Sequence, residues 1–402
     1  MWKNEKMKKL SLVIAVAAAL PVLAHADVTI SGNLAVGIGS TKTTEKGVRQ
    51  TGVDDYGSKI RFTGEEDLGN GLKALFKVEN GFNTDGVPTG GSGSGLWANR
   101  QTYIGLSHDS FGVLRIGYVN DILGDNEAAD NLGGARGDRG YATVPTYDNG
   151  LLPAPFYGAS PDGGTKFFAG DGRAKNTIRW DSPTWAGISA SVQYAAGENA
   201  TANTKAQDYW GYRIGYTTPD NKWFVNGLQW IMTSPKSAIS NSSTSRLEAG
   251  FNGDALSFAV SYSLDSMYGD TTAASGAWVD SGTNKNYNTF FTNHGISNVN
   301  SHLTARHLAV YASYTVGAWK TQAVISQMKN WKVDGQELNT GVRQFGISEV
   351  YQASKRTSFE LGYGLQNENA QYSEAMRAQA GDSTKFQTSS GSTVYLQVTH
   401  KF

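Results

Sequence analysis

Two short stretches decide the fold: Leu114-Arg115-Ile116-Gly117-Tyr118 and, much later, Asn176-Thr177-Ile178-Arg179-Trp180. Each alternates apolar with polar residues, which is the period of a β-strand with one apolar and one polar face. The segment between them, Val119 to Gly172, does not alternate and carries many glycines, prolines and charges. A stretch of this length without regular structure is uncommon in a compact domain and is usually functional or disordered. We therefore predict two amphipathic strands joined by one long polar loop.

The same alternation continues along the chain on both sides of this loop. It is clearest at the end, where Val394, Leu396, Val398 and Phe402 fall on one face of a single segment. We count about sixteen such segments, joined alternately by short turns and long polar connectors, a pattern typical of barrels that cross a bilayer. Lipid offers no hydrogen-bond partner to the backbone, so a sheet can cross it only as a closed barrel. The prediction is an all-β fold, a single transmembrane antiparallel β-barrel over residues 27–402.

A soluble β-sandwich or propeller is the alternative, because the strands of those folds alternate as well. The aromatic residues argue against it, since most of those on the apolar face lie near strand ends, where membrane-spanning barrels carry their interfacial girdles. The aromatic residues that alternation assigns to this face are Tyr103, Tyr118, Trp180, Tyr194, Trp210, Tyr212, Tyr216, Tyr262, Tyr314 and Tyr363.

The N-terminus carries the only continuous apolar run of the chain. Lys8 and Lys9 precede the run Leu10–Leu20, and Ala24-His25-Ala26 ends it with small residues. This pattern predicts a secretory signal peptide over residues 1–26, cleaved after Ala26. A transmembrane anchor is the alternative, but the apolar run is shorter than the ~20 residues that a spanning helix needs. Met7 is a second candidate start.

Composition narrows the function classes. Removing residues 1–26 takes away four lysines and one glutamate, which leaves 31 basic against 34 acidic residues and argues against a nucleic-acid partner. The chain has no cysteine, so it has neither disulfides nor thiolate metal sites. The histidines show no metal-ligand spacing, and no nucleophile–base pair is indicated. We expect no enzymatic activity, no metal and no cofactor.

Several stretches, in this order along the whole mature chain, carry a family resemblance. They are Asp27–Ile30, Gly57–Ile60, Gly64–Ala74, Asn99–Leu106, Phe111–Gly117, Asp181–Pro183, Ser191–Ala195, Ser354–Thr357 and His400–Phe402. With these segments the chain resembles the trimeric general porins of Gram-negative outer membranes, and within them the neisserial and beta-proteobacterial branch. The resemblance implies 16 strands, a homotrimer, and a long third loop folded into each pore as a constriction. Val119–Gly172 occupies that loop position.

In the family, acidic residues on the third loop face basic residues on the barrel wall. Alternation places the candidate basic wall at Lys59, Arg61, Lys73, Lys77, Arg100, Arg115, Arg173 and Lys175. The candidate loop acids are Asp121, Asp125, Glu127 and Asp130, which lack the spacing of a dedicated calcium loop. Two features depart from the family: Tyr118 stands where a basic residue is common, and the loop lacks the Pro-Glu-Phe-Gly-Gly type of motif and is longer.

The resemblance and the polar face together imply a passive, water-filled channel for small hydrophilic solutes and ions in the cell outer membrane, with weak anion preference. A substrate-specific channel for sugars or carboxylates is one alternative, and a structural barrel or adhesin is another. The expected partners are two further copies of the chain, outer-membrane lipid and lipopolysaccharide, and the insertion machinery. We expect that machinery to recognise the final strand, which ends in Phe402.

Overall fold

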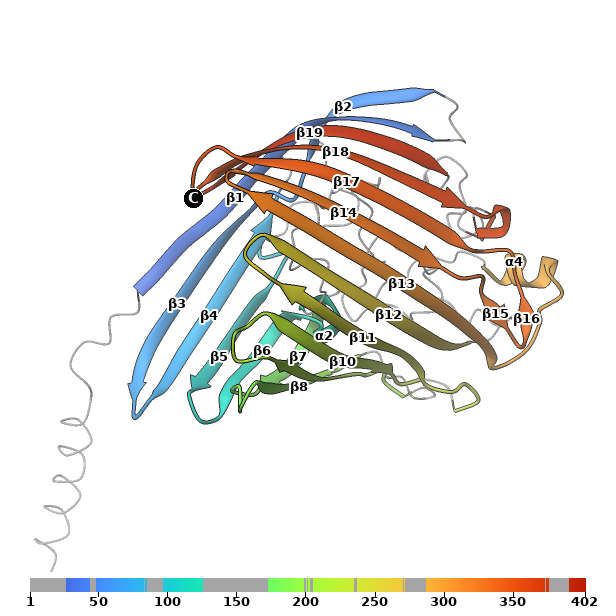
Figure 1. Cartoon of the computed structure of the whole chain (residues 1–402). Coiled ribbons are helices and arrows are strands. Elements are labelled where there is room, and N and C mark those ends of the chain that lie inside the picture. Colours follow the sequence, from blue (N-terminus) through green and yellow to red (C-terminus); the bar gives the residue numbers. More distant parts are fainter. Residues whose placement is uncertain are drawn as a thin grey trace, which may run out of the picture.

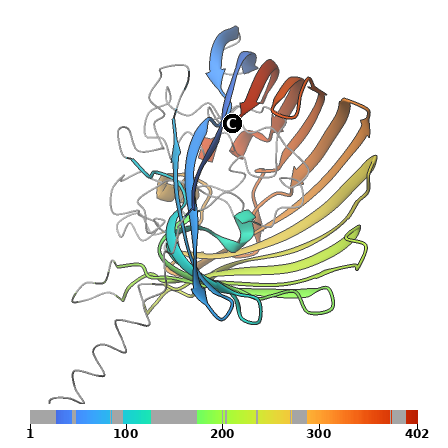
Figure 2. The same ribbon diagram turned by 90° about the vertical axis from the view of Figure 1, so that its left-hand side faces the viewer.

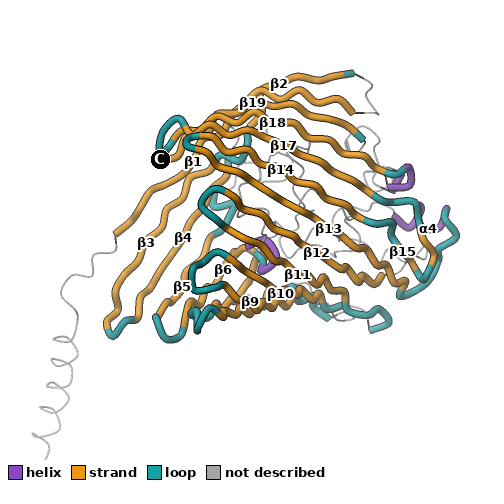
Figure 3. The backbone as a smooth tube through the Cα atoms, in the orientation of Figure 1, coloured by secondary structure: helices purple, strands orange, loops and turns teal. Residues whose placement is uncertain are grey.

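The computed structural model describes residues 27–43, 48–82, 84, 97–125, 173–198, 200, 202, 205–234, 237–269, 271, 287–372, 374–375 and 390–402. The expected signal peptide, residues 1–26, lies outside the described residues, as do the candidate loop acids Glu127 and Asp130. Most of the described chain is antiparallel sheet (Figures 1 and 3). None of its helices combines the length and the apolar character that a bilayer crossing requires.

The strands follow one another as neighbours around one sheet. They are β1 (Asp27–Thr43), β2 (Arg49–Asp55), β3 (Lys59–Gly69), β4 (Leu72–Gly81), β5 (Thr102–His108), β6 (Gly112–Asn120), β7 (Arg173–Asp181), β8 (Ile188–Ala195), β9 (Tyr209–Thr217), β10 (Trp223–Met232), β11 (Ser242–Asn252), β12 (Leu256–Gly269), β13 (Ser301–Val316), β14 (Trp319–Met328), β15 (Lys332–Val333), β16 (Gln336–Glu337), β17 (Val342–Gln352), β18 (Thr357–Glu368) and β19 (Gly391–Lys401). Helix α2 (Ile122–Asp125) follows β6, and helix α4 (Tyr287–Asn293) precedes β13.

The sheet closes on itself, because β1 pairs with β19 on one side and with β2 and β3 on the other. β2 and β3 are two halves of one spanning strand, interrupted at residues 56–58, and β15 and β16 form a small hairpin beyond the wall. The result is a closed antiparallel barrel of 16 spanning strands, which confirms the predicted fold class. Figure 2 looks into the barrel and shows the strands wrapping around its interior.

The two ends of the barrel differ in the length of their connections. One end carries the short turns, including residues 70–71, 109–111, 253–255 and 317–318. At the other end, β6 stops and β7 begins, as do β12 and β13, and long stretches of sequence separate the strands of each pair. The turn between β3 and β4 is Asn70-Gly71, in which both residues have positive φ, as the tight hairpin turn of this kind requires. Short turns belong to the periplasmic side and long loops to the outside.

The outer face is apolar and ends in an aromatic girdle on the short-turn side. Trp223 at the start of β10 contacts the rings of Phe251 and Phe258, with centroids 4.8 Å and 5.8 Å away. Further around the barrel, Trp319 and Tyr351 lie 4.6 Å apart. Such rings sit at the boundary between hydrocarbon and headgroups, so they mark the periplasmic edge of the membrane-facing band.

One aromatic prediction is wrong. Tyr103 pairs with Lys77 on β4, so it faces the interior together with that lysine. The outward residues of β5 are its neighbours Ile104 and Leu106. Alternation counted from Arg100 does not carry into β5, because the strand begins only at Thr102, after a turn that contains Ala98 at a positive φ of 62°.

Candidate functional site: the polar lumen

Ladder register fixes which side chains line the interior, since residues directly opposite each other in antiparallel strands point to the same face. Ile30 on β1 and its partner Phe62 on β3 belong to the outer face. Arg61 and its partner Glu79 on β4 therefore belong to the inner face. Carried around the barrel, the same register gives an inner wall made mainly of polar and charged side chains.

The first charged group of the wall, the Glu79 cluster, gathers several cations around one carboxylate. The Glu79 Oε2 atom lies 2.6 Å from Arg61 Nε and 3.6 Å from Lys77 Nζ, and its Oε1 accepts a 2.7 Å hydrogen bond from Arg100 Nε. Glu79 is buried, with 4% of its side chain exposed, whereas Arg61, Lys77 and Arg100 remain partly exposed. Lys59 lies on the same inner face, one step along the ladder from Arg61. The cluster thus has excess positive charge on its exposed surface.

A second charged group, the Asp181 cluster, lies on β6 and β7. Arg179 Nη2 contacts Asp181 Oδ1 at 2.9 Å, and Arg115 Nη2 lies 3.5 Å from Asp181 Oδ2. Arg115 also lies over the ring of Tyr103, 5.6 Å from its centroid. The pattern of the first group repeats here, with two arginines sharing one carboxylate on the inner wall.

The last residue of β6 and the helix α2 that follows are held against the inner wall. The carbonyl oxygen of Asn120 accepts hydrogen bonds from Arg179 Nη1 at 3.1 Å and from Gln193 Nε2 at 3.2 Å. The carbonyl oxygen of Leu123 in α2 accepts one from Arg246 Nη1 at 3.2 Å. Side chains of Ile122 and Leu123 are fully buried in the apolar cluster that includes residues of β9 and β10. The start of the long connector therefore turns into the barrel, where Figure 2 shows α2.

On the far side of β1, a hydrogen-bonded network surrounds a second buried carboxylate. Glu360 Oε1 accepts bonds from Tyr395 Oη at 2.8 Å and from Gln322 Nε2 at 3.3 Å, and its Oε2 accepts one from Gln397 Nε2 at 2.7 Å. Gln322 in turn accepts a bond from Tyr311 at 3.0 Å. This part of the wall is polar but has few cations, in contrast to β3–β7.

The predicted basic residues do not lie at one level. Lys73 is near the periplasmic turn, where its Nζ lies 3.3 Å from Glu65 Oε2 and half of its side chain is exposed. Arg173 pairs with Asn120, and its guanidinium lies 5.8 Å from the ring centroid of Tyr118. Lys175 is exposed and falls in the irregularity where the register jumps from Thr177 to Ala174. The structure thus brings Lys59, Arg61, Lys77 and Arg100 together and Arg115 beside them, and places the other three elsewhere.

Of the predicted loop acids, Asp121 is buried directly after β6, and Asp125 is the last residue of α2. Among the residues that the structure describes, no group of three potential metal ligands comes together. Sequence reasoning missed the inward residues Arg213 and Arg246, and also the carboxylates Glu79, Asp181 and Glu248 that pair with wall cations. Alternation on β9 and β11 would have found the two arginines.

A closed 16-strand barrel with an apolar outer band and a charged inner wall defines a channel-forming protein of a bacterial outer membrane. The family model described as Gram-negative porin matches residues 11–371, and the chain belongs to this family. One curated relative, a major outer membrane protein P.IB of Neisseria meningitidis serogroup B, is 33% identical over 63% of this chain and 69% of its own length. A second protein of that name, from strain H44/76, is 29% identical over 89% of this chain and 93% of its own length.

Solved structures support the fold. The anion-selective porin from Comamonas acidovorans has a TM-score of 0.67 at 16% identity, covering 94% of this chain and 100% of its own. Salmonella typhi OmpF has a TM-score of 0.60, also at 16% identity, covering 93% of this chain and 97% of its own. The predicted family, the predicted outer-membrane localisation and the prediction of a channel rather than an enzyme agree with these findings.

Proposed function

We propose that this porin is a general diffusion channel, through which small hydrophilic solutes and ions pass without a dedicated binding site and anions pass slightly more readily than cations. The observation that carries this proposal is the inner wall of β3–β7, where the partly exposed Arg61, Lys77 and Arg100 surround the buried Glu79 and the partly exposed Arg115 lies beside Asp181. Charge in a narrow pore sets which ion sign passes. The predicted constriction loop and the cleaved signal peptide, residues 1–26, belong to the same proposal.

Liposome swelling tests the general-diffusion proposal against a substrate-specific channel. Proteoliposomes that contain the mature chain are expected to swell in isosmotic neutral sugars at rates that fall smoothly with solute size, because a water-filled pore selects by diameter. Heat-denatured protein in the same liposomes is the control. Saturable flux of one sugar, with little flux of others of similar size, would replace the proposal with the substrate-specific alternative. Absence of any conductance would favour a structural barrel.

The quaternary proposal is a homotrimer. One of the similar solved structures, OmpT of Vibrio cholerae, is a trimer form, with a TM-score of 0.58. We expect unheated protein to migrate in SDS as a trimer and to collapse to monomers on boiling, because a tightly packed β-barrel assembly resists detergent until its strands melt. Light scattering in mild detergent measures the mass independently. A monomer in that detergent contradicts the proposal.

Two further partners complete the proposal. The insertion machinery is expected to recognise the last strand, β19, whose outward residues include Val394 and Leu396, together with the terminal Phe402 that follows it. Outer-membrane lipid and lipopolysaccharide are expected to cover the apolar outer band.

A further inference from the structure

On the outer face of β14, β17 and β18, a row of polar residues ends the apolar band. Across three ladders, Leu308 lies opposite Gln327, Gln327 opposite Arg343, and Arg343 opposite Asn367. Leu308 is an exposed outward residue, so this whole row faces outward. The parallel row two residues nearer the barrel's middle is entirely apolar and consists of Val310, Ile325, Phe345 and Leu365. The wall therefore changes from apolar to polar within one step.

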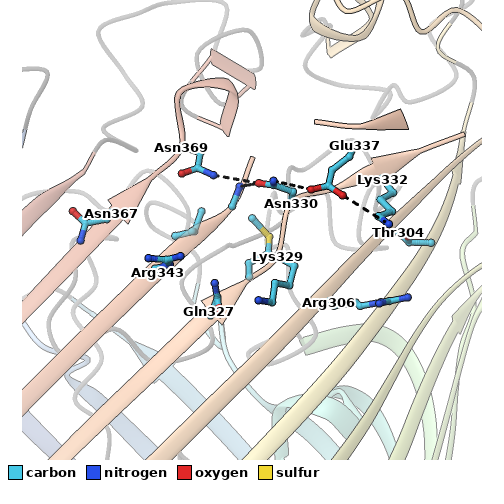
Figure 4. A pocket seen from close by; sticks show the side chains of 13 residues that line it. Thr304, Arg306, Gln327, Lys329, Asn330, Lys332, Glu337, Arg343, Asn367 and Asn369 are labelled. Atoms are coloured by element: carbon cyan, nitrogen blue, oxygen red, sulfur yellow. Dashed lines mark hydrogen bonds and ion pairs between the residues drawn. The ribbon is translucent and has the colours of Figure 1, made fainter. Parts of the chain in front are cut away.

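Above this row lies a cavity of about 700 Å³ at the end of the barrel that carries the long connectors (Figure 4). Four of its lining residues are cations, which we call the rim cluster: Arg306, Lys329, Lys332 and Arg343. Arg306 lies on β13, Arg343 lies on β17, and Lys329 directly follows β14. The backbone N–H of Lys329 donates a 2.9 Å hydrogen bond to the carbonyl of Arg306. The backbones that carry Arg306 and Lys329 are thus held side by side.

The rim cluster has an excess of positive charge. Glu337 is the only acidic residue that lines the cavity among the described residues, and it lies 3.8 Å from Lys332 Nζ. For Arg306, Lys329 and Arg343, the described part of the chain shows no carboxylate within ion-pair distance. Three cations therefore face the cavity with guanidinium and ammonium donors available.

The cavity is also pre-shaped by its polar framework. Asn330 Oδ1 accepts bonds from the backbone N–H of Gly341 at 2.8 Å and from Asn369 Nδ2 at 3.2 Å. Asn330 Nδ2 donates to Glu337 at 3.0 Å. The β15–β16 hairpin is fixed from its other side, because Asp334 accepts a 2.8 Å bond from the backbone N–H of His302. Figure 4 shows the side chains of Asn369, Asn330 and Glu337 joined by these bonds.

We propose that the rim cluster binds the phosphate groups of a lipid of the outer leaflet, of the phosphorylated glycolipid class to which lipopolysaccharide belongs. The apolar row below would contact acyl chains, while the cluster lies at the height of the headgroup. Guanidinium groups bind phosphate in bidentate fashion, and basic clusters beside a membrane surface attract anionic headgroups. This proposal rests on the proposed function, which names lipopolysaccharide as a partner, and it assigns that partner a site on the barrel. The site faces away from the lumen, so loss of lipid binding and loss of channel function are separate outcomes.

Lipid binding to purified, delipidated trimer in mild detergent tests the proposal. The probe is lipopolysaccharide with and without enzymatic removal of its lipid phosphates, and the variant is Arg306→Gln/Lys329→Gln/Arg343→Gln. We expect the variant to bind the phosphorylated lipid at least about tenfold more weakly, because each basic residue near an anionic surface contributes several-fold to affinity. The wild type should bind the dephosphorylated lipid equally weakly.

Lys222→Gln/Lys355→Gln/Arg356→Gln is the matched control, since these three cations lie in turns at the opposite, periplasmic end. It should bind lipopolysaccharide as the wild type does. Unchanged lipid binding by the rim variant overturns the proposal. Binding of inorganic phosphate as tight as that of the lipid also overturns it, because the site would then be one for a soluble anion. Heat-modifiable migration and single-channel conductance of the rim variant verify its fold. A defect in channel function would change the conductance, whereas a defect in the rim cluster alone would change only lipid binding.

Discussion

Removal of Phe402 is expected to lower the amount of folded, membrane-inserted protein by at least about tenfold, while secretion across the inner membrane continues. The backbone of Phe402 extends the β1–β19 ladder that closes the barrel: its carbonyl accepts a 2.9 Å bond from the N–H of Gly32, and its own N–H donates to the Gly32 carbonyl at 3.1 Å. Each such hydrogen bond contributes about 1 kcal/mol to the stability of the closed barrel, and about 1.4 kcal/mol changes an equilibrium constant tenfold. Loss of both bonds and of the ring together therefore exceeds that factor.

Gly32 explains why the ring belongs there. A Cβ on Gly32 would lie 2.6 Å from the Phe402 ring, so the ring covers the strand β1 closely at the point of closure. Phe402→Ala keeps both backbone bonds and removes only the ring, and it separates closure from recognition by the insertion machinery. The readout is heat-modifiable trimer in outer-membrane fractions, with periplasmic precursor measured in parallel and Lys401→Ala as control. Unchanged trimer yield in the deletion variant would remove the assembly role of Phe402.

The fold was predictable from sequence because lipid imposes one rule on every spanning strand. Backbone groups must pair within the sheet, and each strand must present one apolar face, so alternation such as that of Leu114–Tyr118 repeats along the chain. Alternation failed where a strand is not regular. In β7, Asn176 has a positive φ of 53° and the register jumps beside it, which takes Arg173 and Lys175 out of the pattern that placed them beside Arg179.

The charged wall was only partly predictable. Period-two alternation identifies which cations point inward, but it does not say which carboxylate they share. Glu79 lies on β4, whereas its partner Arg100 lies in the connection before β5, to which alternation does not apply. Alternation also does not give the height of a side chain along the barrel axis. Lys73 and Lys77 lie on the same strand and point to the same face, yet Lys73 lies at the periplasmic rim. Three-dimensional register, rather than residue type, decides which inward charges act together.

A reversal potential across a potassium chloride gradient is expected to show modest anion preference for the wild-type pore. The net charge of the mature chain, 31 basic against 34 acidic residues, points the other way. Exposed charges more than about 8 Å away are screened at physiological salt, so the local charge of the wall decides. Arg100→Ala and Arg115→Ala should each shift the potential toward cations, because the carboxylates Glu79 and Asp181 stay behind with fewer partners. A cation-directed wild type that neither variant changes would contradict this assignment.

Glu79→Gln should shift the same potential in the opposite direction. The substitution removes one negative charge and leaves Arg61, Lys77 and Arg100 without their shared carboxylate, while the amide oxygen still accepts a hydrogen bond. A unit charge about 8 Å from the ion path contributes about 0.5 kcal/mol in water, with opposite sign for anions and cations, so the anion-to-cation ratio should rise about fivefold in dilute salt and about twofold at physiological salt.

Glu65→Gln is the matched control for Glu79→Gln, because Glu65 faces the same interior from β3 but lies at the periplasmic rim with 64% of its side chain exposed. There the charge is already screened by water and by Lys73, so its removal should leave the ratio within experimental error. Thermal dissociation of the trimer shows whether the Glu79 variant keeps its wall intact. A buried carboxylate beneath three cations acts on permeating ions only if they pass close to it. Equal shifts in the two variants, or no shift in Glu79→Gln with an intact trimer, would therefore place the ion path away from β3–β5.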